Sequence, residues 1–182
     1  MTAQLVTPNQ AEDSVLVRQF LESGDERAFT TLFKRHASHV AHVVYRVMGN
    51  DMDLDDIVQE TFLAAAAKMP SLLDASRLRP WLTAIALRKM RRRFGERGRR
   101  RKLLERHVAE TPQTTAVSQP EEVRSLYRAL DEVPAKYRIP WILHRLEEHS
   151  LPEVAELCEV SLATVKRRVA ETEKRLERRI GA

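Results

Sequence analysis

Residues 150–169 read SLPEVAELCEVSLATVKRRV and predict two helices joined by a tight turn. Ser150 can cap the first helix, with Pro152 in its first turn and Glu153 completing a capping box. Ser161 can cap the second helix, which runs to about residue 180 with an apolar stripe at every third or fourth position. This pattern predicts a helix-turn-helix, whose second helix enters the major groove of DNA.

The second helix carries three consecutive cations, Lys166, Arg167 and Arg168, near its start. The start of a recognition helix is where side chains meet base edges and phosphates. A hairpin without a DNA-binding role would not require this concentration of positive charge. The pattern therefore favours DNA binding.

Most of the positive charge lies in one segment. The chain has 182 residues and a net charge of +5, and residues 80–106 hold 11 basic and 2 acidic residues. A block of this kind indicates a polyanionic partner, most often nucleic acid. We expect a long helix from Arg79 that is basic on every side past Met90 and projects from its core. Trp81 fits either stacking on an unpaired base or anchoring the core.

Residues 53–69 predict a helix with two distinct faces. One face is apolar and suits a core; its members are Leu54, Val58, Phe62, Ala65 and Met69. The opposite face combines a leucine with small and acidic residues, and its members are Asp56, Gln59, Glu60, Leu63 and Ala67. Such a face suits docking against another protein, although an ordinary solvated face remains the alternative.

The chain divides into two helical parts. We expect a tail over residues 1–12, a first domain over 13–106 and a second domain over 121–182. The first domain begins with a helix over residues 13–23 and a second helix from the cap at Asp25 to about residue 48, whose buried apolar stripe is expected to include Phe33. In the second domain, helices over residues 121–133 and 137–148 are expected to pack behind the helix-turn-helix. The intervening residues 107–120 contain no Lys or Arg and are rich in Thr, Pro and Gln, which is typical of a flexible linker. The expected fold class is all-α, with two small domains and a helix-turn-helix in the second.

Several function classes are not supported by the sequence. Cys158 is the single cysteine, so no internal disulfide or cysteine-based zinc site can form. His36, His39 and His42 recur along one helix but spread over about 120°, which does not suit one metal ion. No constellation of nucleophile, acid and base is present. We therefore expect neither an enzyme nor a metal or cofactor site, and no apolar run is long enough to span a membrane.

Four motifs in order resemble a small bacterial sigma factor of the extracytoplasmic-function type, within the sigma-70 family. They are GDERAF (residues 24–29), DLDDIVQETFL (53–63), RPWLTAIALRKMRRR (79–93) and the helix-turn-helix at 150–169. The resemblance implies a transcription initiation factor that binds core RNA polymerase, directs it to promoters and helps to melt the −10 region. The alternative is a helix-turn-helix regulator that does not engage polymerase.

The resemblance also assigns residues to each contact. Core polymerase is implied to bind Asp56, Gln59, Glu60 and Leu63. The −10 element is implied to meet Arg79, Trp81, Arg88, Lys89, Arg91, Arg92 and Arg93. The −35 element is implied to meet Ser161, Thr164, Lys166, Arg167 and Arg168.

The implied partners are the beta-prime coiled coil and the beta flap of polymerase, promoter DNA and an anti-sigma factor. The implied location is the bacterial cytoplasm, at the nucleoid when the protein is active. The chain departs from the family pattern at Arg88 and Arg92, and at Glu159, where the turn normally holds glycine. Glutamate is strained in a left-handed conformation, so a different turn shape is an open alternative.

Overall fold

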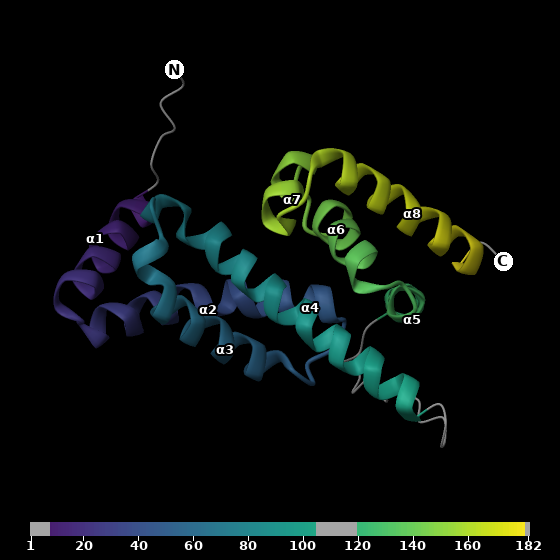
Figure 1. Cartoon of the computed structure of the whole chain (residues 1–182), viewed down its shortest axis with the longest axis horizontal. Helices are drawn as coiled ribbons and strands as arrows, with labels where there is room; N and C mark the ends of the chain where they lie inside the picture. Colours follow the sequence, from purple (N-terminus) through teal and green to yellow (C-terminus); the bar gives the residue numbers. More distant parts are fainter. Residues whose placement is uncertain (1–7, 105–119, 181–182) are drawn as a thin grey trace.

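The computed structural model describes residues 8–104 and 120–180, and every regular element in these ranges is helical. The elements are α1 (Pro8–Ser23), α2 (Glu26–Met48), α3 (Leu54–Lys68), the short 3-10 turns η1 (Met69–Ser71) and η2 (Ala75–Arg77), α4 (Leu78–Leu104), α5 (Glu121–Asp131), α6 (Ala135–Arg145), α7 (Leu151–Cys158) and α8 (Leu162–Ile180). Figure 1 shows α1–α4 as one body and α5–α8 as a second body beside it. The predicted all-α class is confirmed.

The first body is built around α2. Asp25 caps this helix by accepting a hydrogen bond from the backbone N–H of Arg27, and Gly49 ends it with a left-handed φ of 75°. Both local signals were readable from the sequence. The core between the three long helices is formed by Val40, Val44 and Val47 of α2, Ile57 and Ala65 of α3, and Leu82, Ala86 and Met90 of α4.

Three expectations for this body need correction. The first helix begins at Pro8 rather than at residue 13, so part of the predicted tail is helical. On α3, Ile57 is fully buried, whereas Leu54 and Val58 of the predicted stripe are half-buried. The reason is that α3 packs against both α2 and α4, which shifts the centre of its buried face. Phe33 of α2 remains 38% exposed and packs edge-on against Phe62.

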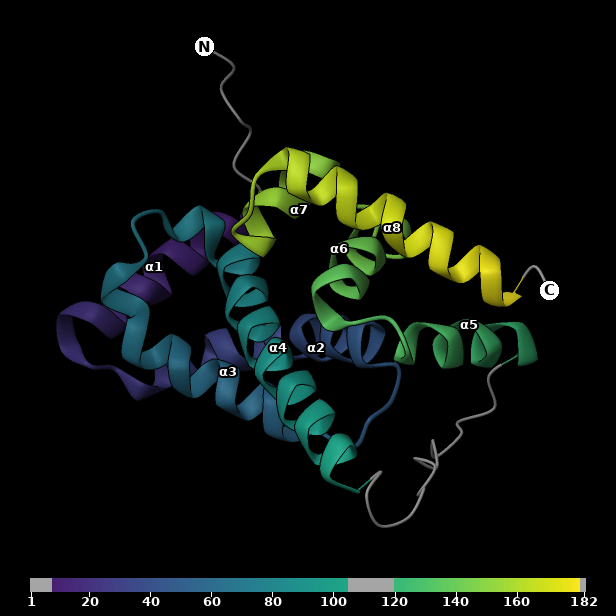
Figure 2. The ribbon, with the colours of Figure 1, turned by 45° about the vertical axis from the view of Figure 1, so that its right-hand side comes forward.

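The second body contains the predicted helix-turn-helix. Ser150 and Glu153 form the predicted capping box at the start of α7. Val154 of α7 and Val165 of α8 are fully buried in the small shared core. Helix α6 packs behind both α7 and α8, and α5 packs against α8. Figure 2 shows α7 and α8 at one edge of the molecule, with α6 behind them and α4 directly beneath α7.

Two helix limits in this body differ from the prediction. Helix α5 ends at Asp131 and α6 covers Ala135–Arg145, whereas the sequence indicated ends near residues 133 and 148. Glu148 has a left-handed φ of 57°, which ends helical continuation before α7 begins. The predicted linker lies outside the described residues except for Pro120, so the predicted domain limits stay a prediction.

Candidate nucleic-acid interface

The cations of α4 divide into two groups that face different neighbours. One group, Lys89, Arg92, Arg93 and Arg97, points toward acidic residues of α3. The other group, Arg88 and Arg91, points toward the end of α7. The sequence predicted a helix that is basic on every side past Met90 and projects from its core. The projection needs correction as far as Arg97, because α3 and the end of α7 supply acceptors for these cations.

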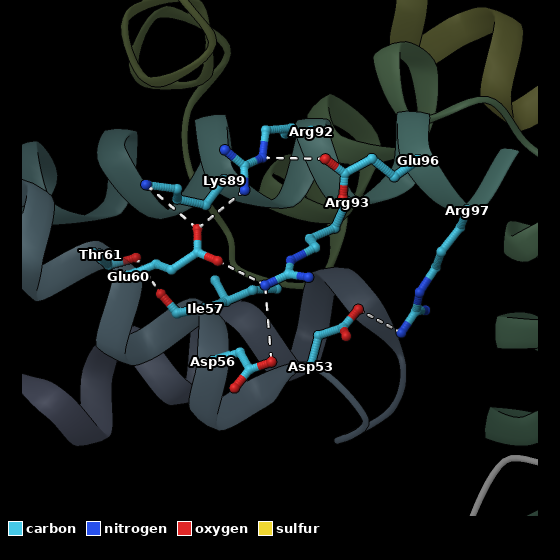
Figure 3. A network of polar contacts seen from close by, with 10 residues as sticks. All are labelled: Asp53, Asp56, Ile57, Glu60, Thr61, Lys89, Arg92, Arg93, Glu96 and Arg97. Atoms are coloured by element: carbon cyan, nitrogen blue, oxygen red, sulfur yellow. Dashed lines mark hydrogen bonds and ion pairs between the residues drawn. The ribbon is translucent and has the colours of Figure 1, made fainter. Parts of the chain in front are cut away.

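Glu60 is the centre of the first group (Figure 3). Arg93 donates a hydrogen bond to Glu60 Oε1 at 2.6 Å, and Lys89 Nζ and Arg92 Nη2 lie 3.4 and 3.7 Å from Oε2. Burial opposes ionisation of this carboxyl, but the hydrogen bond from Lys89 and the charge of Arg93 outweigh it and lower the pKa of Glu60. Glu60 is therefore ionised and forms its ion pairs with the cations of α4.

The contact between α3 and α4 continues further along both helices. Arg93 also lies 3.8 Å from Asp56, and Arg97 forms an ion pair with Asp53 at 2.6 Å (Figure 3). Helix α4 is therefore tied to the start of α3 as far as Arg97, rather than projecting from its core past Met90. Only the last turns extend beyond the other helices in Figure 1.

The second group meets the turn of the helix-turn-helix. Arg88 forms an ion pair with Glu159, and its Nε donates to Glu159 Oε1 at 3.1 Å. Arg91 donates to the carbonyl of Cys158 at 3.1 Å. Glu159 has the left-handed φ of 56° that glycine would adopt, so the alternative of a different turn shape is wrong. The hydrogen bond from Arg88 lowers the pKa of Glu159 and keeps it charged.

The start of α4 is held by α2. Arg79 donates to Nδ1 of His39 at 3.0 Å, and Nε2 of His39 lies 3.0 Å from the hydroxyl of Thr83. Burial, with the charge of Arg79, lowers the pKa of His39 to about 4, so the ring is neutral near pH 7. Trp81 is half-buried against the core, which matches the core-anchor alternative.

One exposed apolar residue at this end of the molecule was not singled out from the sequence. Leu73, between η1 and η2, is fully exposed. An apolar residue inside a short, polar connection is the signal that could have identified it. It stands just ahead of α4, next to the segment assigned to the −10 element.

The outer face of α3 is available to a partner. Asp56, Gln59 and Leu63 are exposed, and Leu63 keeps 65% of its surface exposed. Glu60 differs from them because it turns toward α4. The structure therefore brings three of the four predicted polymerase-binding residues together on an open face and places the fourth at its edge.

The start of α8 is also open. Ser161 accepts a hydrogen bond from the backbone N–H of Thr164 at 3.2 Å, and Lys166 and Arg167 are exposed. Arg168 is half-buried. The predicted recognition residues thus share one helix end, where the helix dipole and two free cations favour phosphate and base contacts.

The three histidines of α2 point to different partners. His36 contacts the buried Asp13 at 2.8 Å, His39 contacts Arg79 and Thr83, and His42 lies 3.5 Å from Glu147. In the described ranges, no group of three His, Cys, Asp or Glu side chains is placed to hold a metal ion. Over the same ranges, no helix is both long and apolar enough to cross a bilayer.

Comparisons with known proteins agree with this arrangement. Residues 32–100 match the family described as Sigma-70 region 2, and residues 124–176 match the family described as Sigma-70, region 4. The first match covers most of α2, all of α3 and most of α4, and the second covers most of α5–α8. The chain belongs to the sigma-70 family, as an extracytoplasmic-function sigma factor.

Its relatives match along nearly the whole chain. The ECF RNA polymerase sigma-E factor of Escherichia coli K12 is 26% identical over 184 residues, covering 94% of this chain and 95% of the relative. The sigma-E factor of Haemophilus influenzae is 25% identical over 185 residues, covering 94% and 96%. The match therefore includes both bodies and the segment between them.

Two solved structures share the fold. CnrH, solved in complex with the cytosolic domain of CnrY, is 28% identical, with a TM-score of 0.60 and coverage of 91% of this chain and 95% of CnrH. The sigma factor RpoE of Bartonella quintana, solved with the anti-sigma factor NepR, is 22% identical, with a TM-score of 0.65 and coverage of 85% and 97%.

This sigma factor is a transcription initiation factor that directs RNA polymerase to specific promoters. The expectation drawn from four short motifs is confirmed. A DNA-binding regulator that does not engage polymerase is not favoured, because the matches include region 2 as well as the helix-turn-helix region.

Proposed function

We propose that this sigma factor binds the beta-prime coiled coil of core polymerase through the outer face of α3. The observation that carries this proposal is the exposed combination of Asp56, Gln59 and Leu63. An exposed leucine beside polar groups is typical of an interface whose polar members set the register. Glu60, at the edge of that face, completes the predicted set while holding α4 in place.

The two DNA contacts are proposed on separate elements. The segment from Arg79 to Arg93 would meet and melt the −10 element, using Arg88, Lys89, Arg91 and Arg92 with Trp81. The start of α8 would read the −35 element through Ser161, Thr164, Lys166, Arg167 and Arg168, with the second body placed at the beta flap. Exposure of Lys166 and Arg167 supports the −35 assignment. The role is binding and melting, without catalysis.

A regulatory partner is also proposed. CnrH and the Bartonella RpoE were each solved with a partner protein, and NepR is an anti-sigma factor. We infer that an anti-sigma factor likewise binds this chain. The proposed place of action is the cytoplasm, at the nucleoid when the chain is bound to polymerase.

The polymerase assignment is tested by Asp56→Arg combined with Gln59→Ala. A matched control is Glu22→Arg combined with Gln19→Ala, which makes the same kinds of change at the same spacing on exposed positions of α1. We expect the α3 variant to lose binding to purified core polymerase and run-off transcription, while the α1 variant retains both. Unchanged polymerase binding by a folded α3 variant would refute the assignment.

A further inference from the structure

A closed loop of three hydrogen bonds links α2 to the start of α4, two helices that pack against each other. Arg79 donates from Nη2 to Nδ1 of His39 at 3.0 Å. Nε2 of His39 lies 3.0 Å from the hydroxyl of Thr83, and that hydroxyl donates to the carbonyl of Arg79 at 3.1 Å. The loop therefore begins at the side chain of Arg79 and ends at the backbone of the same residue.

The three bonds run in one direction, which fixes the position of the proton on His39. The carbonyl of Arg79 can only accept, so the hydroxyl of Thr83 uses its proton there. The same hydroxyl must then accept from Nε2 of His39, which leaves Nδ1 free to accept from Arg79. A ring with its proton on Nδ1, or on both nitrogens, could not accept this bond. Thr83 thus selects the one form of His39 that can hold the guanidinium group.

The loop is buried at one end and open to solvent at the other. Thr83 is 3% exposed and His39 is half-buried, whereas Arg79 is exposed at the start of α4. A free arginine on a surface moves among many rotamers, and it loses this freedom when it binds a partner. Because two inner residues already restrain Arg79, most of that loss is incurred when the chain folds.

His39 holds Arg79 without neutralising its charge. The ring is neutral near pH 7, because burial and the charge of Arg79 oppose its protonation. Lys89 and Arg93 each form an ion pair with Glu60, whereas no ion pair among the described residues includes Arg79. His39 also uses only one of the five N–H donors of the guanidinium group. Arg79 is therefore fixed in direction and keeps its charge for an anionic partner.

We propose that His39 is a positioning residue for promoter binding: together with Thr83 it fixes the guanidinium group of Arg79 in the direction in which it meets a phosphate of the −10 element. This role of His39 rests on the −10 contact proposed above for Arg79. His39 acts through Arg79 and does not itself touch DNA. All three residues lie in α2 and α4, so the loop is complete within the first body.

Two amide substitutions at position 39 separate positioning from support of the fold. His39→Asn places its amide oxygen where Nδ1 lies, so it keeps an acceptor for Arg79 and loses the contact with Thr83. His39→Gln reaches the place of Nε2, so it keeps a donor for Thr83 and loses the acceptor for Arg79. Asparagine is the poorer helix former, so support of the fold alone would favour His39→Gln in the middle of α2. Positioning of Arg79 predicts the opposite order in promoter binding.

The first measurement is binding of the holoenzyme, assembled with saturating core polymerase, to a promoter fragment selected by run-off transcription, at several salt concentrations. Arg79→Ala should weaken binding and reduce the slope of log K against log salt by about 0.7–1, as expected for one lost phosphate contact. His39→Gln should weaken binding by about twofold to tenfold, the cost of immobilising one long side chain at an interface. His39→Asn should bind like the wild type. Binding by His39→Asn that is as weak as that of His39→Gln, or weaker, would overturn the positioning role.

The second measurement combines the substitutions at positions 39 and 79 in the same holoenzyme. If His39 acts through Arg79, His39→Gln has no further effect on promoter binding once Arg79→Ala has removed the guanidinium group. A separate structural role would weaken binding by the same factor in both backgrounds, and such additive losses would overturn the positioning role alone. An unchanged affinity and salt slope for Arg79→Ala would overturn the −10 contact of Arg79 and, with it, the role of His39.

A further variant covers a failure of the His39 variants to fold. Thr83→Val removes the hydroxyl with little change in shape, so the ring proton of His39 is free to move to Nδ1 and block the bond from Arg79. Its control is Thr61→Val, because Thr61 is also buried and also donates to the carbonyl four residues earlier, that of Ile57 at 2.6 Å. We expect Thr83→Val to weaken promoter binding in the presence of Arg79 and to have no effect in the Arg79→Ala background. Equal promoter binding by the two threonine variants would overturn positioning by the loop.

Discussion

Glu60 lies between the proposed polymerase-binding face of α3 and helix α4. The substitution Glu60→Gln tests how much its contact with α4 stabilises the fold. The substitution keeps the shape of the side chain and removes its charge. The side chains of Glu60 and Arg93 are 27% and 25% exposed, so their ion pair is partly shielded from water. We expect the variant to fold and to be less stable than the wild type.

The size of the effect follows from the contacts. Arg93 keeps its charge in the variant and can still donate to the amide oxygen, so only the attraction between the two charges is lost; for a partly exposed ion pair this attraction contributes up to about 1 kcal/mol. Replacing the charged acceptor of Arg93 therefore costs about 1 kcal/mol. Lys89 and Arg92 are 3.4 and 3.7 Å away, and their weaker attraction adds a few tenths of a kcal/mol. A total of about 1.5 kcal/mol lowers the Tm of a chain of this size by about 4 °C.

Urea unfolding followed by circular dichroism measures this difference. Gln59→Ala is the control, since that neighbouring side chain is exposed and its loss should change the free energy of unfolding by less than about 0.5 kcal/mol. The pKa of Glu60 is lowered in the folded chain, so its charge stabilises the fold at neutral pH and ceases to do so as the pH falls through that lowered pKa. The difference in free energy of unfolding between wild type and Glu60→Gln should therefore become smaller at acid pH. Identical urea midpoints at pH 7 would refute the structural role of this network.

Two further substitutions address the recognition helix and the start of α4. Arg167→Ala should reduce discrimination among upstream promoter elements by about 1–3 kcal/mol if this exposed side chain reads a base; a uniform loss across duplex sequences would assign it to phosphate instead. The folded chain holds the pKa of His39 at about 4, whereas the unfolded ring titrates near 6.5, so the wild type should lose stability as the pH falls from 7 to 5. The loss in free energy of unfolding should stay below about 2 kcal/mol because the ring is partly exposed. His39→Gln cannot titrate at this position and should lose less over the same pH range. Urea unfolding at pH 7 and pH 5 measures both losses, and equal losses for wild type and His39→Gln would contradict this origin.

Local chemistry explains why much of the fold was predictable. The capping box at Ser150 and Glu153 and the cap at Asp25 involve residues within three positions of each other. The left-handed end of α2 at Gly49 is equally local. Helix limits were less predictable where a competing turn intervened, as at Glu148. The burial of Ile57 was missed because it depends on two helices that pack on α3 from different sides.

The sequence by itself determined the all-α class, the helix-turn-helix and the location of the basic segment, each of which follows from periodicity, capping or composition within a short stretch of chain. The family was indicated by the resemblance of four short motifs and is shown by the family matches. Only the tertiary structure decided which cations are free. Lys89 and Arg93 meet Glu60, about thirty residues away, and Arg88 meets Glu159, 71 residues away. The charge of a side chain is a local property, but its partner depends on where distant helices cross, and no local pattern encodes that crossing.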